Sequence, residues 1–324
     1  MSADLPLTLR DLYRARQRIA GVAVRTPLAP SAALSAPAGR NVFLKLETQQ
    51  VTGAFKIRGA ANRLLSLSPD ERARGVVTVS TGNHGRAVAY VGSRLGVRVV
   101  VCVPDLVLPH KVAAMRALGA EVVVHGANQD EAEAHATELA RREGLVNVSP
   151  FDDLHVIAGQ GTIGLEILEE CPQIDTVVVP LSGGGLMGGI AFALKAADPG
   201  IRTVGVSMAR GPVMVESVKA GRVLQLPEEP TLADSLMGGI GLENRYTFDL
   251  IRRVVDDYVL VSEEEIAAGM RHALLVEHQV VEGGGAVGLA ALLHDKAPIL
   301  GENVVVVLSG GNVDMQKLLA IASS

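Results

Sequence analysis

The chain has 324 residues and a formal net charge of −5, with 48% hydrophobic and 20% charged residues. This length suits one large α/β domain or two ordinary ones, and the composition argues against disorder, collagen-like repeats and coiled coil. Aromatic residues make up only 3%, and 35 acidic residues outnumber 30 basic ones, so no basic, aromatic-rich surface for nucleic acid is expected.

The two cysteines, Cys102 and Cys171, are too few for a disulfide framework and lack the paired spacing of a zinc site. We interpret both as reduced thiols. Charged residues interrupt the N-terminal segment before a signal-peptide core could form, and no apolar run approaches the roughly 18 residues of a membrane span. The sequence therefore predicts a cytoplasmic protein with no membrane partner.

Strands and helices alternate along the chain, which is typical of parallel sheets built from βαβ units. The predicted strands, rich in Val, Ile and Leu as in sheets covered on both faces, are residues 42–47, 76–80, 98–103, 121–124, 176–181, 202–206 and 303–308. The predicted helices are residues 9–20, 84–95, 111–118, 130–143, 162–169, 187–197, 263–278, 286–294 and 314–322.

The segment 71–150 has its own strand and helix alternation between two joints, SLSPDERARG and SPFDD. We therefore predict a small domain of residues 71–150 that is inserted into a large domain of residues 1–70 and 151–324. A ligand is expected in the cleft between the two domains, because ligands commonly bind at domain interfaces.

Three turns rich in small residues follow predicted strands, at the ends where open α/β sheets bind ligands. The first turn runs from Ser80 to His84 and leads into a predicted helix. The free N–H groups and the dipole of a helix start favour a carboxylate or phosphate. An ordinary helix cap made by Thr81 or Asn83 would give the same pattern.

The second turn contains Gly183, Gly184 and Gly185, and consecutive glycines let backbone N–H groups surround an anion. Together with Gly188 they also match the dinucleotide motif G-x-G-x-x-G. However, the next predicted strand ends at Ser207, where a dinucleotide site needs an acid, and the phosphate motif GK[ST] is absent. A monophosphate group therefore fits this loop better.

The third turn, from Ser309 to Asn312, is either a tight turn into the last helix or brings a hydroxyl to the cleft.

Lys56 lies in TGAFKIRGA, a stretch of small and apolar residues. Most lysines are solvated surface groups, whereas apolar surroundings lower the pKa of an amine and suit Schiff-base chemistry. The position of Lys56 alone leaves both interpretations open.

Taken together, six segments resemble the threonine dehydratase and serine racemase family of fold-type II pyridoxal phosphate (PLP) enzymes. The resemblance covers nearly the whole chain, and an ordered set of motifs is far more specific than any one of them. It implies PLP as cofactor and an α/β, tryptophan synthase β-like fold with two open, mostly parallel sheets and helices on both faces. In chain order the segments are TGAFKIRGA, STGNHG, SPFDDLHVIAGQGTIGLEI, SGGGLMGG, VEGGGAVGLAAL and LSGGNVD.

The resemblance also implies roles for single residues. Lys56 matches the lysine that forms a Schiff base with PLP and then acts as acid and base at the substrate α-carbon. Glu282 matches a glutamate near the cofactor, and it either contacts the cofactor or belongs to a structural ion pair. The implied cofactor-binding residues are Phe55, Lys56, Asn83, Gly183, Gly184, Gly185, Leu186, Met187 and Ser309. The implied substrate-binding residues are Ser80, Thr81, Asn83, His84 and Ser235.

The activity that the resemblance implies is dehydration of a β-hydroxy amino acid to a 2-oxo acid or imine and ammonia. Thr81 occupies the position of a serine in serine racemases, so it is a candidate second catalytic residue and amino-acid racemisation is the alternative. Ser235 replaces a family glycine beside the substrate and changes the pocket's shape and polarity. Ser207 stands where metal-responsive relatives carry a glutamate ligand, so no metal site is expected.

The chain ends about a dozen residues after SGGNVD. This leaves no room for the C-terminal regulatory domain of biosynthetic relatives and predicts a catabolic form. The segments STGNHGRAVAY and SLMGGIGLENRYTFDL most resemble the dehydratase of hydroxyectoine utilisation, with phenylserine and 3-hydroxyaspartate dehydratases as alternatives.

Two other classes of protein stay open as alternatives: a nicotinamide dehydrogenase, and a PLP-binding sensor without turnover. Relatives are commonly dimers, which predicts a homodimer.

Overall fold

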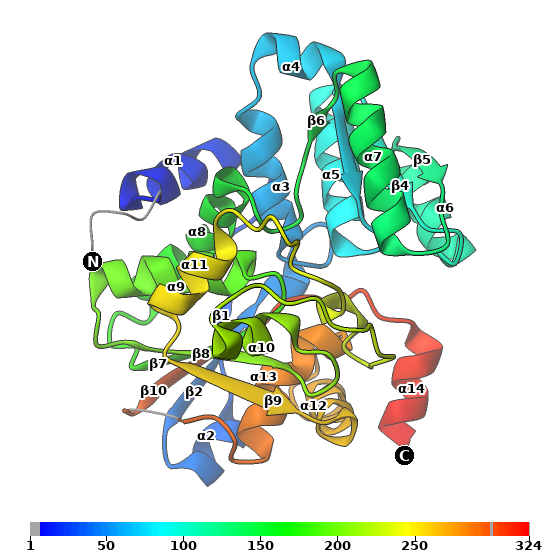
Figure 1. The fold of residues 1–324 in the computed structure, drawn as a ribbon. Coiled ribbons are helices and arrows are strands. Elements are labelled where there is room, and N and C mark those ends of the chain that lie inside the picture. The colour runs from blue at the N-terminus through cyan, green and yellow to red at the C-terminus, as the bar shows by residue number, and fades with distance from the viewer. Residues whose placement is uncertain (1–6, 299–300, 324) are drawn as a thin grey trace.

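The computed structural model describes residues 7–298 and 301–323, and within them ten strands form two separate sheets (Figure 1). All neighbouring strands are parallel except β1 and β2, so the predicted pair of mostly parallel sheets is confirmed. In spatial order the larger sheet consists of β1 (Leu28–Pro30), β2 (Asn41–Leu46), β10 (Asn303–Leu308), β7 (Thr176–Pro180), β8 (Arg202–Met208) and β9 (Asp257–Val261). The smaller sheet consists of β5 (Glu121–Val124), β4 (Val99–Val103), β3 (Val76–Val79) and β6 (Val146–Asn147).

Helices separate consecutive strands, and four of the connections are crossovers between parallel neighbours: β3 to β4, β4 to β5, β7 to β8, and β8 to β9. Two short 3-10 helices, η1 (Glu47–Gln49) and η2 (Asp234–Leu236), lie in the connections. The α-helices are α1 (Leu9–Ile19), α2 (Ala32–Ala38), α3 (Lys56–Leu65), α4 (Pro69–Arg74), α5 (Asn83–Leu95), α6 (Pro109–Ala117), α7 (Gln129–Glu143), α8 (Leu154–Glu170), α9 (Gly185–Ala197), α10 (Val213–Ala220), α11 (Thr247–Val254), α12 (Glu263–Leu275), α13 (Gly283–Leu293) and α14 (Met315–Ser323).

Helices cover both faces of each sheet, as the Val-rich strand sequences predict. Along β7, Val177 and Val179 pack into a core cluster with α1, α8, α9 and α11. Val178, which points to the opposite face, packs with α12, α13 and α14. In the smaller sheet, Val76 packs with α3 and α5, while Val77 packs with α7. The alternation of neighbouring side chains therefore produces two apolar layers per sheet.

The helix α3 packs into the core of the smaller sheet although it precedes residue 71. Its residues Ile57 and Leu64 belong to the same core cluster as Val76 and Val101. The same helix also contacts α8, which packs on the larger sheet. The domain division at residues 71 and 150 stays a prediction, and α3 joins the two sheets across it.

Several elements differ from their predicted extents. The helix α8 begins at Leu154 rather than at residue 162, and α9 and α13 begin at Gly185 and Gly283, before their predicted starts. The glycines inside α8 allow close helix packing instead of breaking the helix: a Cβ on Gly159 would lie 2.6 Å from the carbonyl oxygen of Arg58. The sequence pattern misses β1, β6, β9, α2, α3, α4, α10 and α11, and all of these except β9 are short or lack a side-chain cap.

Candidate active site

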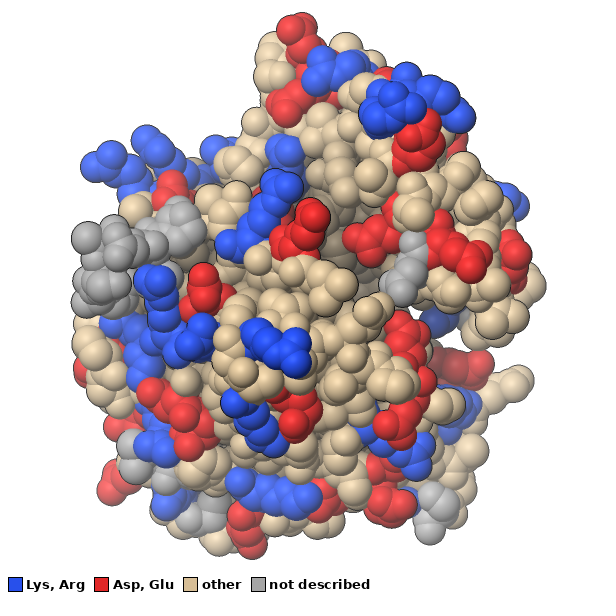
Figure 2. All heavy atoms as spheres, viewed as in Figure 1, with Lys and Arg blue, Asp and Glu red and all other residues tan. Residues whose placement is uncertain are grey.

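The two sheets border one cleft of about 2070 Å³, and residues of both sheets' connections line it. The carboxyl ends of β3, β7 and β10 all deliver turns to this cleft, as expected for parallel sheets. Acidic and basic side chains are mixed over the face shown in Figure 2, and neither sign forms a continuous field there. Among residues 7–298 and 301–323, no helix is long and apolar enough to cross a membrane.

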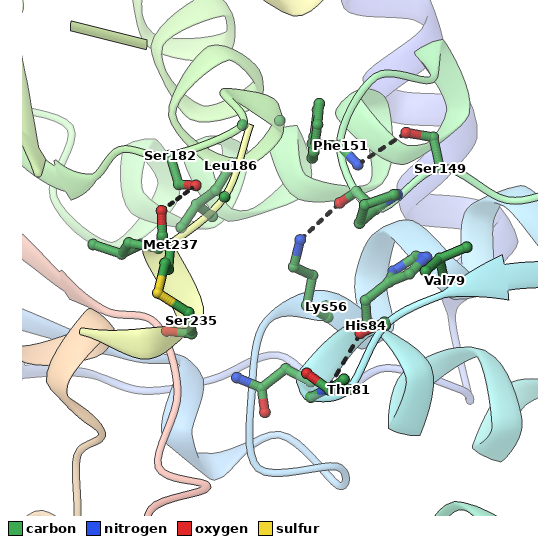
Figure 3. A pocket seen from close by; sticks show the side chains of 18 of the residues that line it. Lys56, Val79, Thr81, His84, Ser149, Phe151, Ser182, Leu186, Ser235 and Met237 are labelled. Atoms are coloured by element: carbon green, nitrogen blue, oxygen red, sulfur yellow. Dashed lines mark hydrogen bonds between the residues drawn. The ribbon is translucent and has the colours of Figure 1, made fainter. Parts of the chain in front are cut away.

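Lys56 is the first residue of α3 and extends into the middle of this cleft (Figure 3). Its Nζ donates a hydrogen bond of 2.7 Å to the carbonyl oxygen of Pro150 and lies 5.2 Å from the centre of the Phe55 ring. The backbone N–H of Phe55 donates to the carbonyl oxygen of Ser309, which ties the lysine's turn to the end of β10. Burial lowers the pKa of the Lys56 amine to about 8, so a neutral, nucleophilic amine is accessible near neutral pH.

The glycine turn after β7 leaves backbone N–H groups unpaired at the start of α9. Gly184 adopts φ +88°, a conformation that favours glycine, and no side chain caps the helix. The first intrahelical bond runs from Gly188 N to Gly184 O, which leaves the N–H groups of Gly185, Leu186 and Met187 free for a ligand. The loop also has no room for side chains on its inner side, since a Cβ on Gly183 would lie 2.3 Å from the Phe151 ring.

A second uncapped helix start, that of α5, faces the same cleft. Gly82 occupies the N-cap position without a side-chain hydrogen bond, so the N–H groups of Asn83 and His84 have no helical partner. Ser80 and Thr81 are half-buried, and Ser80 Oγ accepts a hydrogen bond from Gly82 N. The alternative in which Thr81 or Asn83 caps this helix is therefore wrong.

The side chain of His84 makes a buried contact, whereas its backbone N–H faces the cleft. Its ring is buried, and Nε2 donates a 3.1 Å hydrogen bond to the carbonyl oxygen of Val148. Burial, together with the nearby Lys56, lowers the pKa of the ring to about 3. The ring is therefore a neutral anchor between α5 and the end of β6, and the backbone N–H is the group of His84 left for a substrate.

Glu282 and Ser235 complete the floor of the cleft. The Glu282 carboxylate accepts a 2.7 Å hydrogen bond from Asn83 Nδ2, and a side-chain hydrogen bond from Ser235. Burial, together with the neighbouring Asp234, raises the pKa of Glu282 to about 7. The structure thus places Glu282 against a predicted cofactor ligand and not in a direct ion pair. Figure 3 shows Ser235, Thr81 and Lys56 around the same pocket.

Two residues outside the predicted set also hold the site together. Phe151 packs against the glycine turn, and Asn312 links Asn83 to the backbone of Thr52. Both lie in motifs that can be recognised in the sequence, SPFDD and SGGN. Their contacts could not be predicted, because they join residues that are far apart in the chain. Ser207, where the sequence predicts no metal ligand, is buried and donates to Met208 Sδ. In the described part of the chain, no three His, Cys, Asp or Glu side chains gather to hold a metal ion.

These residues fit PLP. A phosphate would find the free N–H groups of α9, a substrate carboxylate those of α5, and an aldehyde the Lys56 amine. All of these groups line one cleft. The fold and the site together define a PLP-dependent enzyme.

Comparisons with known proteins give the same class. The family model described as "Pyridoxal-phosphate dependent enzyme" matches residues 19–310. A candidate threonine dehydratase of Sinorhizobium fredii is 51% identical over 309 residues, which are 95% of this chain and 93% of the relative. The L-threonine ammonia-lyase of Thermotoga maritima is 42% identical over 312 residues, which are 96% of this chain and 77% of the relative. The structure of maize serine racemase matches with a TM-score of 0.91 and 34% identity, over 97% of this chain and 96% of that chain.

The chain therefore belongs to the PLP-dependent enzyme family, in its group of threonine and serine dehydratases and serine racemases. Its cofactor is PLP, as the motifs predict, and the nicotinamide dehydrogenase alternative is excluded.

Proposed function

We propose that this protein is a PLP-dependent ammonia-lyase that removes water from a β-hydroxy amino acid and releases a 2-oxo acid and ammonia. The observation that carries the proposal is the common position of three groups in one cleft: the Lys56 amine and the two uncapped helix starts of α5 and α9. Relatives named threonine dehydratase and threonine ammonia-lyase support the reaction class.

PLP supplies an electron sink for the α-carbon of a bound amino acid. In the proposed site, the N–H groups of Gly185, Leu186 and Met187 hold the phosphate, and those of Asn83 and His84 hold the substrate carboxylate. Fixing the carboxylate orients the α-C–H bond, which is a positioning contribution. Charge on the amine is disfavoured by burial, so Lys56 Nζ can accept the α-proton near neutral pH.

The products follow from the balance of the elimination. The α-proton and the β-hydroxyl leave the substrate together as water, and a carbon–carbon double bond forms. The enamine product takes up a proton at carbon to become an imine, and water hydrolyses the imine to a 2-oxo acid and ammonia. We assign Phe55 and Ser309 to the cofactor's surroundings, because their backbones bond each other beside Lys56.

The test is release of 2-oxo acid and ammonia by the PLP-loaded protein from L-threonine, L-serine, threo-phenylserine, 3-hydroxyaspartate and hydroxylated 2,4-diaminobutyrate derivatives. Lys56→Ala should abolish release and the visible absorbance of the bound cofactor. Lys219→Ala, which changes a surface lysine whose side chain is 60% exposed, is the matched control and should leave both unchanged. If no substrate releases ammonia while the cofactor binds normally, the ammonia-lyase proposal fails.

Racemisation is the second candidate, and the position of Thr81 favours it. Its half-buried side chain lines the cleft with Lys56 (Figure 3). We propose that its hydroxyl contacts the substrate carboxylate or serves as the second acid and base. Formation of D-amino acid from L-threonine or L-serine, lost in Thr81→Val and retained in Thr81→Ser, would establish racemisation.

The finer assignments are also proposals. The segments STGNHGRAVAY and SLMGGIGLENRYTFDL support a hydroxyectoine-derived hydroxy-diamino acid as substrate. Ser235 is the side chain that we assign to the substrate's variable end, since it lines the cleft. We further propose a cytoplasmic homodimer without a metal requirement, in keeping with Ser207 in place of a metal ligand.

A further inference from the structure

A chain of side-chain hydrogen bonds runs from the helix α5 to the floor of the cleft. Arg86 Nη1 donates to Asn312 Oδ1 at 2.7 Å, and Asn312 Nδ2 donates to Asn83 Oδ1, also at 2.7 Å. Asn83 Nδ2 then donates to Glu282 Oε1 at 2.7 Å. A branch joins Asn312 Nδ2 to the carbonyl oxygen of Thr52 at 2.9 Å. Each amide in the chain thus uses one end as acceptor and the other as donor.

The two ends of this chain allow only one direction of donation. A guanidinium group has no acceptor, so Arg86 can only donate, and it requires the oxygen of Asn312 to face it. A backbone carbonyl can only accept, so Thr52 requires the NH2 group of Asn312 on the other side. The orientation of the Asn312 amide is therefore determined twice, by a donor and by an acceptor.

The space around Asn312 gives a third constraint. A Cβ on Gly53 would lie 2.7 Å from Asn312 Oδ1, and Gly53 has φ +75°, so only glycine suits this position. The amide consequently packs directly against the backbone of the turn that precedes Lys56. The backbone N–H of Gly311 donates to the carbonyl oxygen of Gly53, which holds the two turns together.

The fixed orientation of the Asn312 amide also determines the orientation of the Asn83 amide. Because its Oδ1 accepts from Asn312, its NH2 group must point the other way, toward Glu282 and the cleft. An asparagine amide in solution can turn over with little cost, since its two ends have nearly the same shape. At this site a turned amide would set its NH2 group against the NH2 group of Asn312 and its oxygen against the Glu282 carboxylate.

We propose that Asn312 and Arg86 are positioning residues, which orient the Asn83 amide so that it presents a hydrogen-bond donor to PLP. The proposal rests on the proposed function only for the role of Asn83 as a cofactor ligand. It does not depend on which amino acid is the substrate. Neither Arg86 nor Asn312 needs to touch the cofactor, because both act through Asn83.

The sharpest variant is Asn312→Asp, which keeps the shape of the side chain and replaces its donor by an acceptor. The aspartate can still accept from Arg86, but it draws the NH2 group of Asn83 toward itself and leaves the Asn83 oxygen facing the cofactor. We expect the dissociation constant of PLP from the apoprotein to rise about tenfold or more. We also expect the pH titration of the bound cofactor's visible absorbance to shift, since a donor to the cofactor is lost.

Arg86 provides graded variants. Arg86→Lys keeps a donor and should bind PLP as the wild type does, whereas Arg86→Met removes it. Because Thr52 still orients Asn312, Arg86→Met should weaken PLP binding by only about threefold. Circular dichroism and the thermal midpoint of each apoprotein show whether the variant is folded. If Asn312→Asp does not fold, the difference between Arg86→Lys and Arg86→Met still decides the question.

A double-mutant cycle separates positioning from a general effect of charge. In an Asn83→Ala background no amide remains to be oriented, so Asn312→Asp should cause little further loss of PLP affinity. Equal losses in both backgrounds, or an unchanged affinity and absorbance titration in Asn312→Asp, would overturn the proposal. These measurements need no substrate, so they remain valid even if the ammonia-lyase assay fails.

Discussion

Lys56 Nζ donates a hydrogen bond of 2.7 Å to the carbonyl oxygen of Pro150, a residue 94 positions later in the chain. Pro150 lies at the joint between the smaller sheet and α8, directly before Phe151, which packs on the glycine turn. The bond therefore holds the reactive amine of α3 beside the start of α9. Attachment of the cofactor requires that this bond is released and that the amine has lost its proton.

The first prediction concerns the pH dependence of PLP attachment. Burial lowers the pKa of Lys56 to about 8. Only the neutral, deprotonated amine attacks an aldehyde. The rate of appearance of the bound cofactor's absorbance should therefore rise as the pH rises through about 8, and level off above it. Stopped-flow mixing of apoprotein with PLP measures this rate. A midpoint near 10.5, the ordinary value for lysine, would contradict it.

The second prediction is that Glu282→Gln changes how stability depends on pH. Burial raises the Glu282 pKa from 4.5 to about 7, so between these values the folded protein keeps a proton that the unfolded chain has released. The free energy of unfolding of the wild-type apoprotein therefore falls as the pH rises through this window. Glu282→Gln removes this loss, and its stability relative to the wild type should improve by roughly 2 kcal/mol from pH 5 to pH 8.

Urea unfolding of the apoproteins at several pH values measures this difference. Glu243→Gln is the matched control, because residue 243 lines the same cleft but is exposed. The control should follow the wild type across the whole window. A pH-independent difference between Glu282→Gln and the wild type would show that Glu282 is ionised throughout.

The third prediction concerns the glycine turn. A Cβ on Gly183 would lie 2.3 Å from Phe151 Cδ1, which is far inside van der Waals contact. Gly183→Ala should therefore displace the turn and weaken PLP binding at least tenfold, and adding Phe151→Leu should restore part of the affinity. Gly239→Ala, in the cleft wall where a Cβ meets only Gly241 N at 4.0 Å, is the control. Normal PLP affinity in Gly183→Ala would mean that the turn yields without cost.

The fourth prediction concerns the buried ion cluster beneath α3. The Arg58 guanidinium is 1% exposed and bonds the carboxylates of both Glu47 and Glu166, with distances from 2.6 to 2.8 Å. Arg58→Met leaves these two buried carboxylates with fewer partners, and should lower the free energy of unfolding by about 3–5 kcal/mol. Chemical denaturation measures this loss. Arg141→Met removes a surface ion pair of α7 and should cause no measurable change.

Much of the fold could be predicted because its signals are local. The Val-rich runs of β4, β7 and β10 are buried on both faces, so each reads as a strand without knowledge of its neighbours. The turns before α5 and α9 can be recognised as possible anion sites because their signal is also local. In each turn, the glycines stand next to the helix start in the chain. Both turns line the cleft.

The helix α3 shows why other elements were missed. Phe55 stands at its N-cap and makes no capping hydrogen bond, so the usual sequence signal for a helix start is absent. The helix forms because Ile57 and Leu64 pack with the smaller sheet, while Arg58 bonds carboxylates of η1 and α8. These partners lie between 11 and 108 positions away in the chain, beyond any local pattern.

The sequence by itself determined the α/β class, the order of the motifs and the places of the glycine-containing turns that follow the strands. Those features depend on residue types at short spacing, where periodicity and backbone freedom act directly. Only the tertiary structure decided that the His84 ring anchors to Val148 and that Asn312 orients Asn83 toward Glu282. Each of these contacts joins residues 64 to 229 positions apart, and a hydrogen bond forms only when the packed sheets bring its two atoms within about 3 Å.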